Sequence, residues 1–306
     1  MTEPTMIAEG LKFPEGPIVM DDGSVILVEI ARGTLTRVNG GQVEVVAHLG
    51  GGPNGAALGP DGWVYVCNNG GFQWHEHNGR LYPGEEPENY ATGRIEKVNI
   101  DTGDVEILYT HCDGQPLRGP NDIVFDASGG FWFTDHGKTR PRERDRTGVF
   151  YAQPDGAGIR EVIFPMEGPN GIGLAPDESE LYVAETATGR LWAFPLAGPG
   201  KLAEVRADRP DGGRLVPGRP GYYLFDSLAV EEDGRVCVAT LMDGGISILS
   251  PRSGAPDFVP MPDRLTTNIA FGGADRCTAY VTLSSTGKLV TLPWARPGLK
   301  LNFAAG

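Results

Sequence analysis

The sequence contains little cysteine and none of the common nucleophile or nucleotide motifs. Its four cysteines, at positions 67, 112, 237 and 277, lie far apart. A zinc finger or a thiol redox centre needs closely spaced cysteine pairs, so the spacing argues against both. There is no GxSxG turn, no Walker loop and no dinucleotide fingerprint between a strand and a helix. A serine hydrolase or a nucleotide-dependent enzyme is therefore not expected.

Positive charge is scarce as well. The 26 Lys and Arg residues face 40 Asp and Glu residues, which gives a formal net charge of −14. Such a surface repels phosphate backbones and anionic lipids, so we expect no nucleic acid and no membrane as a partner. No apolar run has the length of a membrane span, and residues 1–17 lack the basic and apolar regions of a signal peptide. We expect a cytoplasmic location, and a monomer or small homo-oligomer.

Amphipathic helical stretches are missing too, while turn residues are abundant. The 45 Gly and 25 Pro residues are spread along all 306 positions, which is typical of many short strands. One phrase recurs six times. It consists of a polar anchor residue, a short apolar run, an acidic turn with Gly and a second apolar run. The anchors are Glu15, Asn54, Asn121, Asn170, Asp226 and Asn268.

The repeat predicts an all-β fold, a six-bladed β-propeller formed by residues 1–306 as a single domain. The shorter anchor spacings match the roughly 40–50 residues of one four-stranded blade. Two further strand-like runs follow the core phrase in the first three copies, which completes four strands per repeat. A propeller closes by joining its last blade to its first. Either residues 5–11 (TMIAEGL) or residues 299–303 (LKLNF) could supply the closing strand.

The register of the repeat also predicts a central site. The first strand of each blade lines the central channel, so the six anchors should meet at one rim. All six side chains carry oxygen, and carboxylates with amide carbonyls are typical ligands of hard divalent cations. Without a cation, Glu15 and Asp226 would repel each other. Asn54 and Asn268 are the anchors that most resemble ordinary turn or pocket residues.

Four segments carry a family resemblance. Residues 13–17 (FPEGP), 119–122 (GPND), 168–171 (GPNG) and 225–234 (FDSLAVEEDG) resemble, in this order, the senescence marker protein 30/gluconolactonase family. The related diisopropylfluorophosphatase and paraoxonase propellers share the architecture. The resemblance implies one axial divalent metal, with ligands at Glu15, Asn121, Asn170 and Asp226. In some members the third-repeat Asn mainly contacts substrate.

The resemblance implies a metal-dependent hydrolase that opens a lactone or similar ester with metal-activated water. Asp226 is then the catalytic residue, as general base or nucleophile. Oxygen ligands favour Ca²⁺ as the cofactor, with Mg²⁺, Mn²⁺, Zn²⁺ and Fe²⁺ as alternatives. Members commonly carry Arg two residues before the third-repeat Asn, whereas this chain has Gly119 there and Arg118 one position earlier.

Two insertions interrupt the repeat, at residues 69–93 and 206–224. The first is rich in aromatic residues and His, so it is either a pocket wall or a solvated loop. As a wall it would suit a substrate less polar than a sugar lactone. Candidate substrate contacts are Asn54, Asn268, Arg118, His136, Trp74, His75 and Tyr223.

Two other functions remain open, and a third is disfavoured. An organophosphate or aryl-ester hydrolase could use the same site, and a non-catalytic propeller could bind calcium there. A lyase resembling strictosidine synthase is disfavoured, because those propellers lack this set of carboxylates and Asn.

Overall fold

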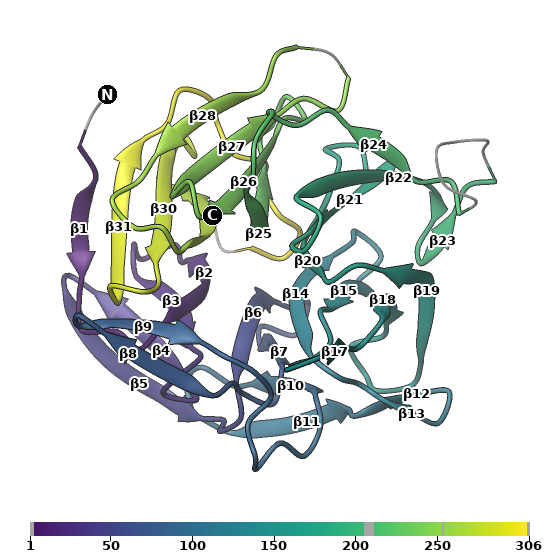
Figure 1. Ribbon diagram of the computed structural model, residues 1–306, viewed down its shortest axis with the longest axis horizontal. Coiled ribbons are helices and arrows are strands. Elements are labelled where there is room, and N and C mark those ends of the chain that lie inside the picture. Colours follow the sequence, from purple (N-terminus) through teal and green to yellow (C-terminus); the bar gives the residue numbers. More distant parts are fainter. Residues whose placement is uncertain (1–2, 205–210, 253, 305–306) are drawn as a thin grey trace.

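The computed structural model describes residues 3–204, 211–252 and 254–304. Six antiparallel sheets surround a central axis, and the described residues contain no helix (Figure 1). The predicted six-bladed β-propeller is therefore confirmed. The described residues contain no helix that is long and apolar enough to cross a membrane.

The blades follow one another along the chain, and each inner strand begins at the axis. Blade 1 contains β2 (Pro14–Val19), β3 (Val25–Glu29), β4 (Thr34–Asn39) and β5 (Gln42–His48). Blade 2 contains β6 (Pro53–Leu58), β7 (Val64–Asn68), β10 (Arg94–Val98) and β11 (Val105–Tyr109). Blade 3 contains β14 (Pro120–Phe125), β15 (Phe131–Asp135), β18 (Thr147–Ala152) and β19 (Ile159–Met166).

The second half repeats the pattern. Blade 4 contains β20 (Pro169–Leu174), β21 (Glu180–Glu185), β22 (Arg190–Gly198), β23 (Lys201–Leu202) and β24 (Arg214–Val216). Blade 5 contains β25 (Leu224–Val230), β26 (Val236–Leu241), β27 (Gly245–Leu249) and β28 (Asp257–Pro260). Blade 6 contains β29 (Thr266–Gly272), β30 (Thr278–Leu283), β31 (Lys288–Pro293) and β1 (Thr5–Ala8). Three hairpins are additional: β8 (Trp74–His77) with β9 (Arg80–Pro83), β12 (His111–Cys112) with β13 (Gln115–Pro116), and β16 (Thr139–Arg140) with β17 (Glu143–Arg144).

The N-terminal strand closes the ring. Strand β1 pairs antiparallel with β31, with Thr5 opposite Thr291 and Met6 opposite Val290. Pairing the first strand with the last blade covers an edge that would otherwise expose unpaired backbone groups. Of the two candidate closing segments, residues 5–11 therefore supply the outer strand. The other, residues 299–303, crosses one mouth of the central channel instead.

The same type of turn joins the first two strands of all six blades. In the turn between the first and second strands, an Asp carboxylate accepts a hydrogen bond from the backbone N–H two residues later, an Asx turn. The bonds run to Asp22, Asp61, Asp126, Asp177, Asp233 and Asp275. The acidic turn of the repeat thus fixes each hairpin at the end of the channel away from the anchors.

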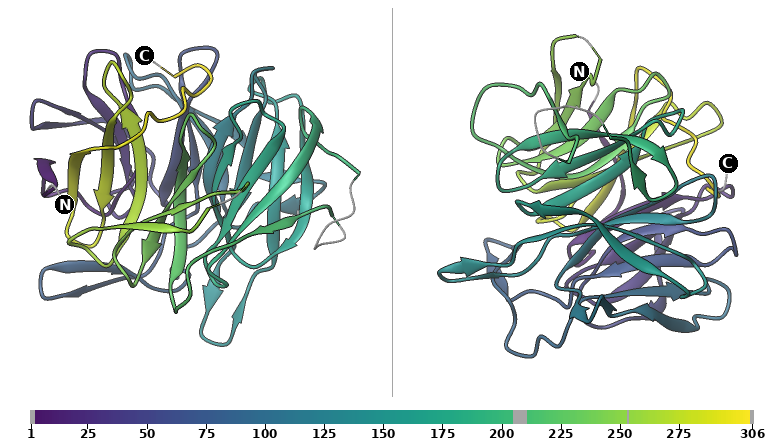
Figure 2. Two further views of the ribbon diagram at one scale, coloured as in Figure 1. Left: turned by 90° about the horizontal axis from the view of Figure 1, so that it is seen from above. Right: turned by 90° about the vertical axis from the view of Figure 1, so that its right-hand side faces the viewer.

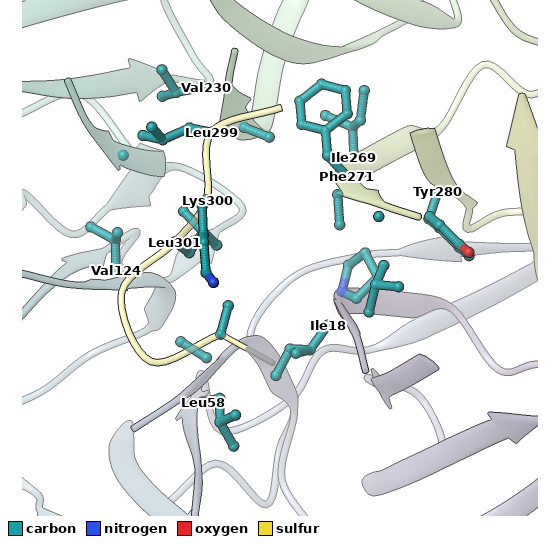
Figure 3. A pocket seen from close by; sticks show the side chains of 18 of the residues that line it. Ile18, Leu58, Val124, Val230, Ile269, Phe271, Tyr280, Leu299, Lys300 and Leu301 are labelled. Atoms are coloured by element: carbon teal, nitrogen blue, oxygen red, sulfur yellow. The ribbon is translucent and has the colours of Figure 1, made fainter. Parts of the chain in front are cut away.

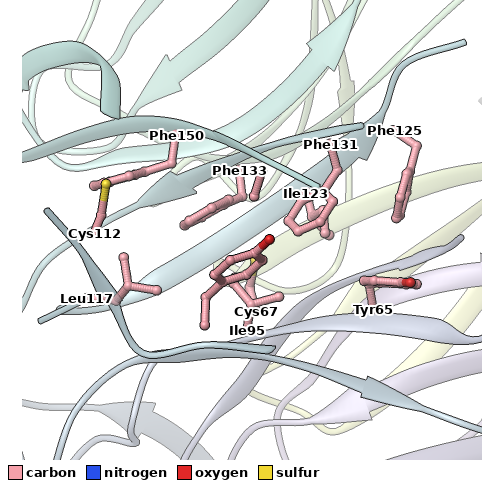
Figure 4. Packing of buried hydrophobic residues seen from close by; sticks show 12 residues of the cluster. Tyr65, Cys67, Ile95, Cys112, Leu117, Ile123, Phe125, Phe131, Phe133 and Phe150 are labelled. Atoms are coloured by element: carbon pink, nitrogen blue, oxygen red, sulfur yellow. The ribbon is translucent and has the colours of Figure 1, made fainter. Parts of the chain in front are cut away.

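The core lies between neighbouring blades. Residues from blades 2 and 3 form one cluster in which the Phe131 and Phe133 rings are fully buried against Tyr65 and Ile95 (Figure 4). The Tyr65 and Phe125 rings meet edge to face at 5.0 Å between centroids. Such aromatic pairs add about 0.5–1.5 kcal/mol beyond the burial of their area. Packing of this kind holds the blades, and with them the inner strands, in fixed relative positions.

Candidate active site

The structure brings the six anchors to one rim of the channel. Each anchor is the second or third residue of an inner strand. Five of them are at most 6% exposed, whereas Asp226 is partly exposed. Asp226 is therefore the anchor residue with the most exposed surface.

Glycines after the anchors let neighbouring inner strands approach closely. A Cβ on Gly16 would lie 2.6 Å from the Asn54 carbonyl oxygen, and one on Gly55 would overlap the carbonyl of Asn121. A Cβ on Gly171 would lie 2.7 Å from the carbonyl of Asp226. Only glycine fits at such distances. The glycine that follows the anchor is therefore required by the tertiary structure, because it lets successive anchors lie side by side.

Asp122 is a site residue that the sequence reasoning missed. In the third repeat it occupies the position that holds Gly in three others, and it lines the central channel. The side chain is buried and accepts a hydrogen bond from the Ile123 N–H at 2.9 Å. Burial and then the nearby Glu15 raise the pKa of Asp122 to about 8. The change from GPNG to GPND was the available signal.

The carboxyl groups at the rim interact strongly with one another. Burial raises the pKa of Glu15 to about 7, although hydrogen bonds from Asn268 and the Gly16 N–H oppose the shift. The Asn268 Nδ2 donates to Glu15 Oε2 at 2.6 Å, and the Gly16 N–H donates to the same oxygen at 2.8 Å. Burial, and then the charge of Glu15, raise the pKa of Asp226 well above its usual value. Full ionisation of this group of acids therefore requires a nearby positive charge.

Two amide oxygens suit a cation. The Oδ1 atoms of Asn121 and Asn170 are buried and have no hydrogen-bond partner among the described residues. The Asn170 Nδ2 donates to Thr186 Oγ1 at 3.0 Å, which fixes the orientation of the amide. Buried acceptors normally find a partner, and a hard divalent cation bound to oxygen ligands would provide one. No cluster of three or more His, Cys, Asp and Glu ligands occurs in the ranges described, so a cation here would depend on these amides.

A histidine and an arginine border the same rim. The backbone N–H of His136 donates to the Gly119 carbonyl at 2.8 Å, and the ring Nε2 lies 3.3 Å from Arg144 Nη2. Burial, and then the charges of Arg144 and Lys138, lower the pKa of His136 to about 3, so its ring is neutral. The Arg144 guanidinium lies over Gly168, two residues before Asn170, where any side chain would displace it. Sequence reasoning named His136 but not Arg144, which belongs to no repeat.

The insertion at residues 69–93 forms a wall on the anchor face. Asn68, the last residue of β7, lies opposite Pro53 at the start of β6, so the insertion leaves the blade beside the anchors. It folds into the β8–β9 hairpin, and the Leu81 N–H donates to the Ser285 carbonyl of blade 6 at 2.9 Å. The left view of Figure 2 shows β8–β9 and β16–β17 projecting from the side opposite the C-terminus.

A buried lysine ties this wall to blade 3. Lys138 Nζ donates to the Gly71 carbonyl at 2.6 Å and lies 4.5 Å from the centre of the Phe72 ring. Burial lowers the pKa of Lys138 to about 7. The contacts of Lys138 hold the start of the insertion against the loop after β15.

The remaining predicted contacts are spread over the face. Arg118 lies at the rim, where its carbonyl accepts a hydrogen bond from the Tyr90 hydroxyl of the insertion at 2.6 Å. Trp74 packs on the Phe13 ring, whereas His75 is exposed on the hairpin.

Tyr223 lies at the start of blade 5. It packs on Phe225 and donates its hydroxyl to the Arg219 carbonyl at 2.6 Å. Part of the second predicted insertion, residues 206–210, lies outside the described residues.

Known proteins show the same fold and related sequences. The chain is 26% identical over 276 residues to a gluconolactonase of Zymomonas mobilis subsp. mobilis, covering 80% of this chain and 69% of that protein. It is 26% identical over 260 residues to lactonase drp35 of Staphylococcus saprophyticus, covering 84% and 72%. A gluconolactonase structure from Xanthomonas campestris has a TM-score of 0.70 at 20% identity, over 96% of this chain and 95% of that one.

A calcium-binding protein shares the fold as well. The structure of regucalcin from Agrobacterium tumefaciens has a TM-score of 0.70 at 17% identity, over 97% of both chains. The model of the SMP-30/Gluconolactonase/LRE-like region matches residues 13–285. Because that match extends from the first inner strand to the last blade, this chain belongs to the SMP-30/gluconolactonase/LRE-like family.

Proposed function

We propose that this protein is a metal-dependent hydrolase that opens a lactone at the anchor rim. The observation that carries the proposal is the pair of buried, unpartnered amide oxygens of Asn121 and Asn170 beside two interacting carboxyl groups. The names of the relatives, gluconolactonase and lactonase, support the reaction class. Glu15, Asn121, Asn170 and Asp226 would hold one divalent cation, for which oxygen ligands favour Ca²⁺.

The four residues would have different roles, which depend on their charge and exposure. A bound divalent ion polarises an ester carbonyl and lowers the pKa of water, which is the chemistry that the cofactor supplies. Glu15 is fully enclosed and hydrogen-bonded by Asn268, so it supplies charge without reaching the substrate. Asp226 is partly exposed, so it can accept a proton from water or attack the carbonyl. Asn121 and Asn170 add oxygens without adding charge.

The substrate would enter beneath the two hairpins of the anchor face. Arg144 offers a positive charge at the edge of the site, beside the neutral ring of His136. The rings of Phe72 and Trp74 lie in the insertion on the other side. This combination suits a lactone or ester with an apolar portion and one polar or anionic substituent.

The test is lactone hydrolysis in a pH-indicator assay. Metal-stripped protein receives each divalent ion in turn, and the panel contains sugar, aliphatic and aromatic lactones, an aryl ester and a phosphotriester. We expect turnover that requires metal and is lost in Asp226→Ala. The matched control is Asp257→Ala, an exposed carboxylate on blade 5, which should keep full activity. A fully active Asp226→Asn enzyme would refute the catalytic assignment. A preference for the phosphotriester would change the assigned substrate class from lactones to organophosphates.

A calcium-binding protein without catalysis is the second candidate, because regucalcin shares the fold and is described by that property. It predicts tight Ca²⁺ binding by calorimetry and no turnover of any ester in the panel. Metal-dependent turnover with any lactone would exclude it.

A further inference from the structure

A second chamber occupies the central channel on the side opposite the anchors. It has a volume of about 400 Å³, and its inner end is bounded by Gly16, Asp122 and Asn268. From there it extends along the inner strands to the mouth that faces away from the hairpins (Figure 3). The volume lies within the range of small-molecule sites, about 300–1,000 Å³.

The side wall of this chamber is apolar all the way round. Every blade contributes at least one aliphatic side chain to it, and the six blades in turn supply Ile18, Leu58, Val124, Ile172, Val230 and Ile269. Such a ring favours a hydrocarbon group over a sugar or a nucleotide, since polar ligands would lose their hydrogen bonds to water there.

The C-terminal strap, residues 298–304, crosses the outer mouth. The Gly298 N–H donates to the Arg276 carbonyl at 2.9 Å, and the Leu299 N–H donates to the Val230 carbonyl at 2.8 Å. Further along, Asn302 Nδ2 donates to the Phe125 carbonyl of blade 3 at 3.1 Å. The strap is thus attached on both sides of the channel, and it narrows the mouth without filling the chamber.

A lysine side chain lies at this mouth. Lys300 is an exposed residue of the strap, and its side chain lies at the mouth of the chamber, as Figure 3 shows. It forms no ion pair with any residue in the described ranges. The other cation of the lining, Arg276, is already bonded to the Gly298 carbonyl and lies 3.4 Å from Glu232. Asp21 also lines the mouth, where it lies exposed to solvent.

We propose that this chamber binds a single-chain aliphatic carboxylate, with the hydrocarbon chain inside the ring of blades and the carboxylate on Lys300. An apolar cavity with an ammonium group at its mouth fits an amphiphile with a single negative head. The chamber opens on the face opposite the metal rim, and the two sites meet only at its inner end. The proposal does not depend on the proposed lactonase activity.

The experiment measures binding of hexanoate, octanoate, decanoate, dodecanoate and hexadecanoate to metal-stripped protein by calorimetry, with decanol as the uncharged probe. Affinity should rise about fourfold per added methylene until the chamber is filled. Lys300→Gln should weaken decanoate about tenfold and leave decanol unchanged. Lys201→Gln, an exposed lysine on blade 4, is the matched control and should change neither.

A second variant locates the ligand. Ala270 lines the chamber, so Ala270→Phe should block both decanoate and decanol, while thermal unfolding checks that the variant is folded. Absence of binding in the whole series would overturn the proposal. So would binding that needs added metal, competes with a lactone or is unchanged in Lys300→Gln, because each result would put the ligand elsewhere. Loss of lactone hydrolysis in Asp226→Ala with unchanged decanoate binding would separate the two sites.

Discussion

Glu15→Gln should stabilise the metal-free protein at pH 8, although it changes a proposed metal ligand. The hydrogen bonds from Asn268 and from the Gly16 N–H end on one oxygen of Glu15, Oε2, so a carboxamide oxygen can accept both. The substitution removes only the ionisable group. Glutamine keeps the shape of the side chain, so no cavity or overlap is introduced.

The magnitude follows from the pKa of Glu15. It is raised from 4.5 to about 7 by burial, so the folded state holds this proton more tightly than the unfolded chain does. Stability linked to such a group is complete below pH 4.5 and is lost as the pH rises to about 7. A shift of about 2.5 units corresponds to about 3 kcal/mol at pH 8 and to less than about 1 kcal/mol at pH 5. Gln does not ionise, so it avoids this loss.

The assay is urea or thermal unfolding of chelator-treated protein at pH 5 and pH 8. We expect Glu15→Gln to raise the melting temperature by about 5–10 °C at pH 8 and to change it little at pH 5. Added Ca²⁺ should stabilise the wild type and not the variant. Glu44→Gln, an exposed carboxylate on β5, is the control and should change neither value. Equal destabilisation by Glu15→Gln at both pH values would refute the electrostatic reasoning.

Three further outcomes test the architecture and the rim. Gly55→Ala should lower the free energy of unfolding in urea by about 2 kcal/mol or more, because the new methyl group overlaps the next inner strand. Gly158→Ala is the control, and it should be close to neutral because the methyl group meets open space. Equal effects would contradict the close approach. Removal of residues 1–9 should lower the melting temperature and increase light scattering, because it exposes the edge of β31; an unchanged protein would mean that closure is dispensable. Arg144→Gln should raise KM about tenfold for lactones with an anionic substituent and leave kcat nearly unchanged, and an equal effect on unsubstituted lactones would contradict direct charge recognition.

Much of the fold could be predicted because the information is local and repeated. Each blade carries the same acidic turn, and the structure shows the same Asx hydrogen bond at every copy, from Asp22 to Asp275. Because the turns fix the hairpins, the register of the anchors follows, and with it their common rim. The cation bound by Glu15, Asn121, Asn170 and Asp226 stays a prediction.

Contacts between distant residues could not be predicted in this way. Arg144 lies in a short hairpin outside the repeat, and only folding brings it over Gly168. Asp122 replaces a Gly of the repeat in the sequence, but its burial in the channel arises because the neighbouring inner strands enclose it. No local pattern marks Arg144, and the roles of both residues depend on how close the blades approach.

The sequence by itself determined the number of blades, the order of their strands and the chemical nature of the anchor ring, because repeated short-range patterns specify each of these. Only the tertiary structure decided which end of the chain closes the ring, since residues 5–8 and 299–303 are both strand-like and only the former pair with β31. It also decided the pKa of Glu15 and the existence of the chamber behind Lys300. These properties arise from burial and from the distances between blades, which become defined only when the ring is closed.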